Sequence, residues 1–111
     1  MVKLVYKIML SNYYGYKRGE YMERTQLNFG DALAVLKVGG KVARKGWNGK
    51  GMYIYYVPAA SYKACTENAR NEFGDRVPYE PYLAIKNVKG TISTWVPSIN
   101  DCLAEDWEII E

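Results

Sequence analysis

Alternation of hydrophobic and polar residues at the start of the chain predicts a strand. Residues 2–9 place apolar side chains at every second position, with lysines between several of them, as in a strand with one face in water. A polar, tyrosine-rich turn follows, and residues 20–24 can return as a partner strand. We therefore predict that residues 1–26 form an added N-terminal hairpin, whose tyrosines are suited to contacts with another subunit.

A helix is predicted over about residues 28–38. Asn28 is a favourable N-cap, and Asp31 stands three residues later, as in a capping box with a shorter acidic side chain. Gly39 and Gly40 end the helix. The apolar positions recur on one stripe, as expected for a helix that covers a core; they are Phe29, Ala32, Leu33 and Leu36.

A hairpin is predicted to follow this helix. Its strands are Lys41–Lys45 and Met52–Val57, and Asn48-Gly49 between them is a strong turn signal. The returning strand is apolar or aromatic on both faces, so we expect both of its faces to be covered. In a chain of this size the second cover is expected to come from another subunit, which predicts an oligomer.

The next segment, Ser61–Phe73, is predicted to be a short helix. Ser61 is its cap, Cys65 lies on its apolar side and Gly74 ends it. Pro78 and Pro81 then bracket an extended stretch.

A second hairpin is predicted from Tyr82–Lys86 and Thr91–Val96, with Gly90 in the left-handed position of its turn. Simple register places Leu83 across from Trp95. Ser98 caps a helical turn that runs to Leu103, with Asp101 three residues after the cap, and Asp106–Ile110 is the final strand, with Trp107 in the core. The expected fold class is therefore α+β: a small antiparallel sheet with one main helix and short additional helices.

Composition limits the organisation of the chain. Its 111 residues, of which 49% are hydrophobic, suffice for one domain with a modest core, so we expect a single domain over residues 1–111. No run approaches the roughly 20 apolar residues that span a bilayer, and the N-terminus is too short and too charged for a signal peptide. We expect a cytoplasmic protein without a membrane partner, in which Cys65 and Cys102 stay reduced.

The residue types that are missing exclude several kinds of chemistry. The chain has no histidine, which excludes imidazole catalysis, Ser-His triads and histidine metal sites. We expect no metal and no cofactor. Residues 37–50 hold five cations and no acid, whereas residues 101–111 hold five acids and no cation. A nucleic-acid-binding protein spreads basic charge over a broader face, so we do not expect nucleic acid as a partner.

The cationic stretch Lys41–Tyr53 is the main candidate for binding chemistry. Its thirteen residues contain four cations, Trp47 and three glycines, with no acid. Arg44 and Lys45 offer charge-assisted donors, the glycines let backbone N–H groups approach a ligand, and Trp47 supplies a flat face for stacking. The alternative is a cationic hairpin whose tryptophan fills the core. The same two roles, core or ligand binding, are both possible for Trp95. Its register opposite Leu83 favours the core, whereas its strand neighbours Thr91 and Ser93 are polar.

Two separated stretches resemble a known family. LNFGDALAVLKVGGKVARKGWNGKGMYIYYVP and PYLAIKNVKGTISTWVPSINDCLAEDWEII are similar to phage proteins of the Thoeris anti-defence two family. The most specific parts are the helix start, the VARKGWNGKGM hairpin, the W-x-P-S segment and the LAEDW ending. The resemblance covers residues 27–58 and 81–111, which implies a sponge domain over residues 27–111 with an inserted segment at about residues 59–77.

The resemblance implies a binding protein that does not turn over its ligand. Members of the family sequester cyclic signalling nucleotides, chiefly cyclic ADP-ribose isomers made by TIR-domain immune enzymes and in some cases cyclic oligonucleotides, and assemble as homotetramers with pockets between protomers. The matching tryptophans would stack the base, the cationic hairpin would meet phosphate and Asp101 would take ribose hydroxyls. The implied ligand-binding residues are Arg44, Lys45, Trp47, Asn48, Trp95, Ser98 and Asp101.

Two other hypotheses about the function agree with the sequence. The chain would be a nucleotide-degrading enzyme if Asp101, Glu105 or Asp106 served as a general base or metal ligand, although the capping pattern already explains Asp101. It would be a structural or protein-binding phage module if its aromatic residues only made subunit contacts.

Overall fold

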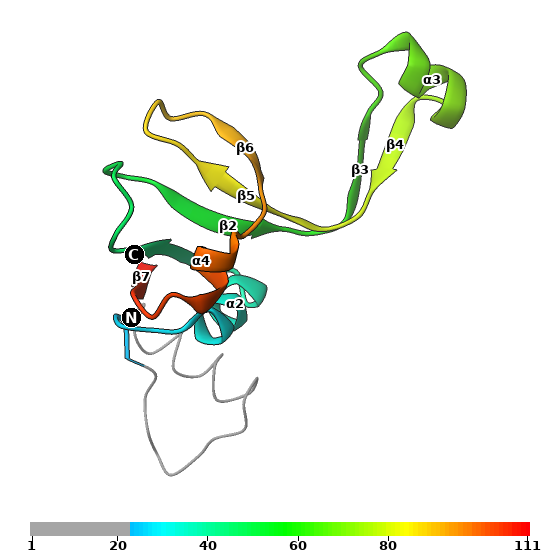
Figure 1. Cartoon of the computed structure of the whole chain (residues 1–111). Helices are drawn as coiled ribbons and strands as arrows, with labels where there is room; N and C mark the ends of the chain where they lie inside the picture. Colours follow the sequence, from blue (N-terminus) through cyan, green and yellow to red (C-terminus); the bar gives the residue numbers. More distant parts are fainter. Residues whose placement is uncertain (1–22) are drawn as a thin grey trace.

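The computed structural model of the chain describes residues 23–111, so most of the predicted N-terminal hairpin lies outside the described residues. The fold is α+β, as predicted, with an antiparallel five-stranded sheet in the order β6-β5-β2-β1-β7 (Figure 1). Its strands are β1 (Lys41–Arg44), β2 (Tyr53–Val57), β5 (Tyr82–Lys86), β6 (Ile92–Trp95) and β7 (Trp107–Ile110).

Helix α2 (Phe29–Lys37) covers one face of this sheet. The side chain of Asn28 accepts a hydrogen bond from the backbone N–H of Asp31, which confirms the predicted cap. Gly39, with a φ of 94°, ends the helix in the left-handed conformation that glycine tolerates. The helix packs on β1, β2 and β7. The buried core comprises Leu27, Ala32, Ala34, Val35, Leu36, Val42, Ile54, Trp107 and Ile109.

Strand register divides the sheet into an inner and an outer face. Val42 pairs with Ile54, which pairs with Ile85, and these side chains face α2. Alternate residues therefore point to the opposite side. Tyr53 and Lys86, which pair with each other, belong to this outer face, which none of the helices in the described chain covers.

A separate arm projects from the sheet (Figure 1). It consists of β3 (Ala60–Lys63), α3 (Glu67–Phe73) and β4 (Arg76–Tyr79), in which β3 and β4 form their own two-stranded sheet. The prediction of a helix from Ser61 was wrong. Residues 60–63 instead pair with residues 76–79, and the helix begins after Thr66, whose hydroxyl accepts the N–H of Ala69.

The last third of the chain follows the prediction closely. Leu83 lies opposite Trp95 in the β5–β6 hairpin, and Gly90 in its turn has a φ of 86°. Helix α4 (Ile99–Leu103) begins at Ser98, which forms a reciprocal capping box with Asp101. Trp107 in β7 is fully buried, as predicted. None of the helices in residues 23–111 is long and apolar enough to cross a membrane.

Candidate functional site

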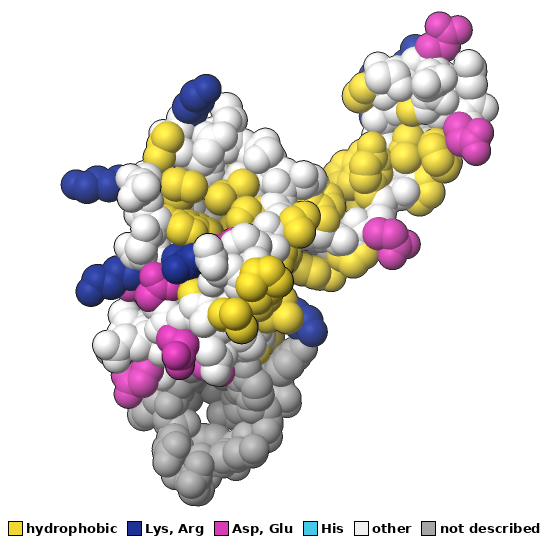
Figure 2. Space-filling view, viewed as in Figure 1, with side chains coloured by type: hydrophobic (Ala, Val, Ile, Leu, Met, Phe, Trp, Pro, Cys, Tyr) yellow, Lys and Arg dark blue, Asp and Glu magenta, His cyan; other side chains and the backbone are white. Residues whose placement is uncertain are grey.

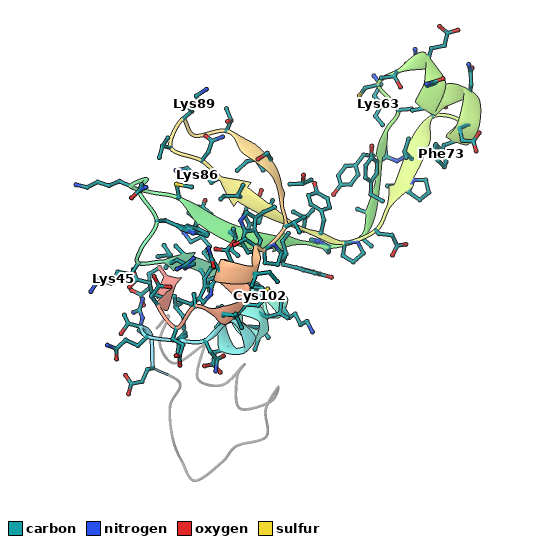
Figure 3. The ribbon with its side chains drawn as sticks, in the orientation of Figure 1. Lys45, Lys63, Phe73, Lys86, Lys89 and Cys102 are labelled. Atoms are coloured by element: carbon teal, nitrogen blue, oxygen red, sulfur yellow. The ribbon has the colours of Figure 1, made fainter. Side chains whose placement is uncertain are left out.

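The loop between β1 and β2, which we call the basic loop (residues 45–52), is fastened to the segment just before β7. The backbone N–H of Lys45 donates to the carbonyl of Asp106, and the N–H of Gly46 donates to the Asp106 carboxylate, both over 3.0 Å. A Cβ on residue 46 would lie 2.9 Å from that carboxylate, so glycine permits this close approach. Lys45 and Asn48 are exposed on the loop, and Lys45 extends from the body in Figure 3.

Arg44, the last residue of β1, joins two acids from the end of the chain. Its Nε donates to Oδ1 of Asp106 over 2.8 Å, and its Nη1 donates to Oδ1 of Asp101 over 3.0 Å. These side chains are mostly shielded from water, with exposed fractions of 22% for Arg44, 13% for Asp101 and 33% for Asp106. We call these three residues the ion-pair triad. It links the basic loop to helix α4.

Asp101 also completes the cap of α4. Its second carboxylate oxygen accepts the backbone N–H of Ser98 over 2.9 Å, while the Ser98 hydroxyl accepts the N–H of Asp101 over 3.1 Å. The backbone carbonyl of Asp101 accepts the indole N–H of Trp107 over 3.0 Å. One residue thus connects the ion-pair triad, the helix cap and the buried tryptophan.

The triad shifts the pKa values of its members. The hydrogen bonds to Asp106 and then to Asp101 raise the pKa of Arg44 above its ordinary value. For Asp101, burial favours the neutral acid, but the Ser98 N–H and Arg44 outweigh it and lower the pKa. The pKa of Asp106 is lowered, chiefly by Arg44, against a smaller opposing effect of burial. Both carboxylates are therefore ionised at neutral pH.

Four aromatic rings lie together beside the triad. Trp107 is at their centre, with ring centroids 5.5 Å from Trp47, 6.0 Å from Trp95 and 5.4 Å from Phe29. Trp47 and Trp95 also contact each other, at 6.3 Å with an interplanar angle of 63°. Both remain partly exposed while they pack against the core. The sequence allowed each tryptophan to fill the core or to offer a surface to a ligand. In the structure each does both, because one part of its ring packs against the core and another part is in water.

Five of the predicted site residues lie in one connected cluster. Hydrogen bonds join Asp101 to Arg44 and to Ser98, and the rings of Trp47 and Trp95 contact each other. Trp107 connects the two groups, because its indole N–H donates to the carbonyl of Asp101 and its ring contacts both other tryptophans. The other two, Lys45 and Asn48, lie on the adjoining basic loop.

Asp106 and Phe29 belong to the cluster but were not predicted as ligand-binding residues. The sequence interpretation considered Asp106 only as a base or metal ligand of an enzyme. The sequence feature that could have indicated a role for Asp106 in the site is its position directly before Trp107 in the LAEDW ending.

Apolar surface borders this cluster on α4 and on the segment just before it. Val96 is 82% exposed, Ile99 74% and Leu103 76%. In the space-filling view hydrophobic side chains gather over α4 and along the arm (Figure 2). Cys65 and Cys102 are free thiols, as predicted. Among residues 23–111, no three His, Cys, Asp or Glu side chains are grouped so that they could hold a metal ion.

Sequence comparisons match almost the whole described part of the chain. Residues 27–110 match the family model of the Thoeris anti-defense 2-like domain. The protein named Thoeris anti-defense 2 from Bacillus phage SP01 is 37% identical over 87 residues, which are 78% of this chain and 98% of that relative. The family match thus spans the sheet, the ion-pair triad, the tryptophans and the arm.

Proposed function

The chain belongs to the Thoeris anti-defense 2-like family, and from this premise we propose that it counters Thoeris defence by binding a cyclic nucleotide signal and holding it without degradation. The proposed ligand is a cyclic ADP-ribose isomer or a related cyclic oligonucleotide, in the cytoplasm of the infected host. The resemblance noted in the sequence suggested this ligand class. The chemistry of the cluster around Trp47 and Trp95 supports it.

The observation that carries the proposal is the partly exposed tryptophan pair beside the ion-pair triad. Trp47 and Trp95 are both fixed against the buried ring of Trp107. Rings held in this way lose little side-chain entropy when a ligand stacks on them. A base stacked on an aromatic side chain contributes about 1 to 3 kcal/mol. The pair therefore suits a ligand that contains a purine.

Polar groups for the rest of a nucleotide lie on both sides of the tryptophans. Lys45 is exposed and has no carboxylate partner among residues 23–111, so its ammonium is available to a phosphate. Arg44 uses only Nε and Nη1 in the triad and retains further N–H donors. The Asp101 carboxylate has spare acceptor capacity for ribose hydroxyls. Asn48 and Ser98 are proposed to complete the polar contacts.

The energies of these groups agree with submicromolar binding. Two stacking contacts and three charge-assisted hydrogen bonds contribute up to about 15 kcal/mol together. After an association cost of at least about 4 kcal/mol, up to about 11 kcal/mol remains, which lies between the values for micromolar and nanomolar affinity. A protein that removes a scarce signal by stoichiometric binding needs submicromolar affinity or better.

An enzyme that degrades the nucleotide is the second candidate, because Asp101 and Asp106 lie in the cluster. Both carboxylates have lowered pKa values and accept hydrogen bonds from Arg44 and from backbone N–H groups. A general base works best with a pKa near the operating pH. The environment of these acids therefore favours a binding role over proton transfer.

The assembly is also part of the proposal. We infer that the apolar surface on α4 packs between copies of the chain, which agrees with the homotetramer suggested by the family resemblance. The ligand would then contact residues of more than one protomer.

One titration followed by one recovery step tests the proposal. Calorimetry of the full chain with a cyclic ADP-ribose isomer should give saturable, submicromolar binding. Heating the complex to denature the protein should then release the ligand with unchanged mass and retention time. Release of a hydrolysed nucleotide would support the enzyme instead, and no heat of binding with cyclic ADP-ribose isomers or cyclic oligonucleotides would overturn the proposal.

A further inference from the structure

Two lysines surround one tyrosine on the outer face of the sheet, on the side away from α2. The ammonium nitrogen of Lys41 lies 4.8 Å from the ring centroid of Tyr53, and that of Lys86 lies 5.6 Å from the same centroid. All three side chains are half-buried. We call these residues the lysine–tyrosine group.

Strand order fixes the arrangement of this group. Tyr53 begins β2, which lies between β1 and β5. Lys86 on β5 pairs directly with Tyr53, whereas Lys41 comes from β1, one residue before the Val42–Ile54 pair. The two ammonium groups therefore approach the tyrosine from strands on its opposite sides.

In the described part of the chain, neither ammonium is paired with an acid. No carboxylate of residues 23–111 forms an ion pair with Lys41 or Lys86. Glu108 belongs to the same face, opposite Ala43, but pairs with neither lysine. Lys86 donates to the carbonyl of Gly51 over 3.3 Å. The ring face stabilises each cation, and no acid among the described residues offsets the positive charge of the group.

We propose that the lysine–tyrosine group binds an extended phosphate anion, such as a diphosphate, with one charged end at each lysine. An ammonium has three donors, so both lysines keep N–H groups for oxygen atoms of a ligand. The Tyr53 hydroxyl adds a donor on the same face. Cations that reach one tyrosine from the strands on either side of it suit an anion with two charged ends better than a single phosphate.

This site is separate from the tryptophan cluster. Trp47 and Trp95 pack with the core beneath the inner face, whereas Tyr53 alternates with the inward Ile54 and belongs to the outer face. The inference therefore does not depend on the proposed sequestration of a cyclic nucleotide. A variant of one site can be tested against a ligand of the other.

The test uses inorganic pyrophosphate and inorganic phosphate as probes, with the full chain in about 10 mM salt, where screening is weak. Calorimetry or NMR titration should show pyrophosphate bound more tightly than phosphate. Lys41→Met and Lys86→Met should each weaken pyrophosphate binding at least about tenfold, the loss expected for one charge-assisted hydrogen bond. Each variant should also lose most of the preference for pyrophosphate over phosphate.

Lys89→Met and Lys63→Met are matched controls, because they remove the same charge from exposed positions on the β5–β6 turn and on the arm (Figure 3). Both should keep pyrophosphate affinity within about threefold, because distant exposed charges interact weakly through water. Equal losses in all four variants would show a general charge effect and overturn the proposal. Unchanged affinity in Lys41→Met and Lys86→Met together with a loss in Lys45→Met would place the anion on the basic loop and would overturn it as well.

Discussion

Arg44 and Asp101, separated by 57 positions in the sequence, are joined by a hydrogen-bonded ion pair of 3.0 Å. Each residue was expected to contact a different part of a ligand. Arg44 was expected to bind a phosphate, and Asp101 was expected to bind ribose hydroxyls. In the structure they hold each other and, with Asp106, fasten the basic loop to α4. A ligand at this site would therefore meet charges that are already oriented.

This pairing predicts that Arg44→Ala lowers stability as well as affinity. The substitution leaves two neighbouring carboxylates without their cation and removes two charge-assisted hydrogen bonds. We expect a loss of about 1 to 3 kcal/mol in the free energy of unfolding, measured by urea denaturation. Calorimetry on the folded variant should show a further loss of ligand affinity. An unchanged free energy of unfolding would mean that the ion pairs are energetically neutral surface contacts.

Lys45→Ala is the matched variant for phosphate binding. Lys45 is exposed and its side chain has no ion pair with residues 23–111. Stability should stay within about 0.5 kcal/mol of the parent, while affinity for a cyclic ADP-ribose isomer falls by about 1.5 to 3 kcal/mol. If affinity is retained at both low and high salt, Lys45 is a solvated surface charge.

The lowered pKa values of Asp101 and Asp106 predict a specific loss of stability in acid. Their folded pKa values lie below the unfolded value of about 3.9. The stabilisation is fully present above that value and is lost as pH falls through the folded pKa values. Unfolding free energies measured between pH 7 and pH 2 should decline below about pH 4. Asp101→Asn should flatten this decline, and an identical decline in the variant would contradict the assignment.

Local signals in the sequence predicted the elements that depend on local interactions. Asn28 and Ser98 cap their helices by side-chain contacts three residues away, and Gly90 takes the left-handed turn position that its context requires. The register of Leu83 opposite Trp95 followed from the short turn between their strands. Such features need only neighbouring residues, so one sequence contains enough information to place them.

Features that depend on long-range pairing were not predicted. Ser61 and Thr66 are both acceptable helix caps, and the pairing of β3 with β4 decides between them by making Ser61 a strand residue. The role of Asp106 depends on β7 lying beside β1, which brings residue 106 to Arg44 across 62 positions. The LAEDW ending singles out Asp106, but no local pattern around Asp106 or Arg44 indicates that the two residues are in contact.

The exposed apolar residues of α4 predict self-association. Ile99 and Leu103 have exposed fractions of 74% and 76%, and a lone protomer would leave this surface in water. Sedimentation at micromolar concentration should show a dimer or tetramer. Leu103→Glu places a charge in this surface and should shift the population toward monomer, while Val88→Glu, at the exposed β5–β6 turn, serves as the control. A monomeric parent would contradict both the association and a ligand site shared between protomers.

The tryptophans give a prediction that distinguishes a ligand surface from a core. Trp107 is fully buried and contacts Trp47, Trp95 and Phe29. Trp107→Ala should therefore cost about 3 to 5 kcal/mol of folding stability, and any folded fraction should be small. Trp47 and Trp95 are only partly buried, so their replacement by alanine should cost less stability than that of Trp107.

Binding should follow the opposite order. Trp47→Ala and Trp95→Ala should each weaken affinity for a cyclic ADP-ribose isomer by about 1 to 3 kcal/mol, the contribution of one stacked base. Trp47→Phe keeps an aromatic face and should recover part of that affinity, which a purely structural role would not require. Thermal midpoint and affinity are measured on each variant. The contrary result is a variant that lowers the thermal midpoint by many degrees while its folded fraction binds the ligand with normal affinity. That result would place the replaced tryptophan in the core alone, because loss of a stacking contact must weaken affinity.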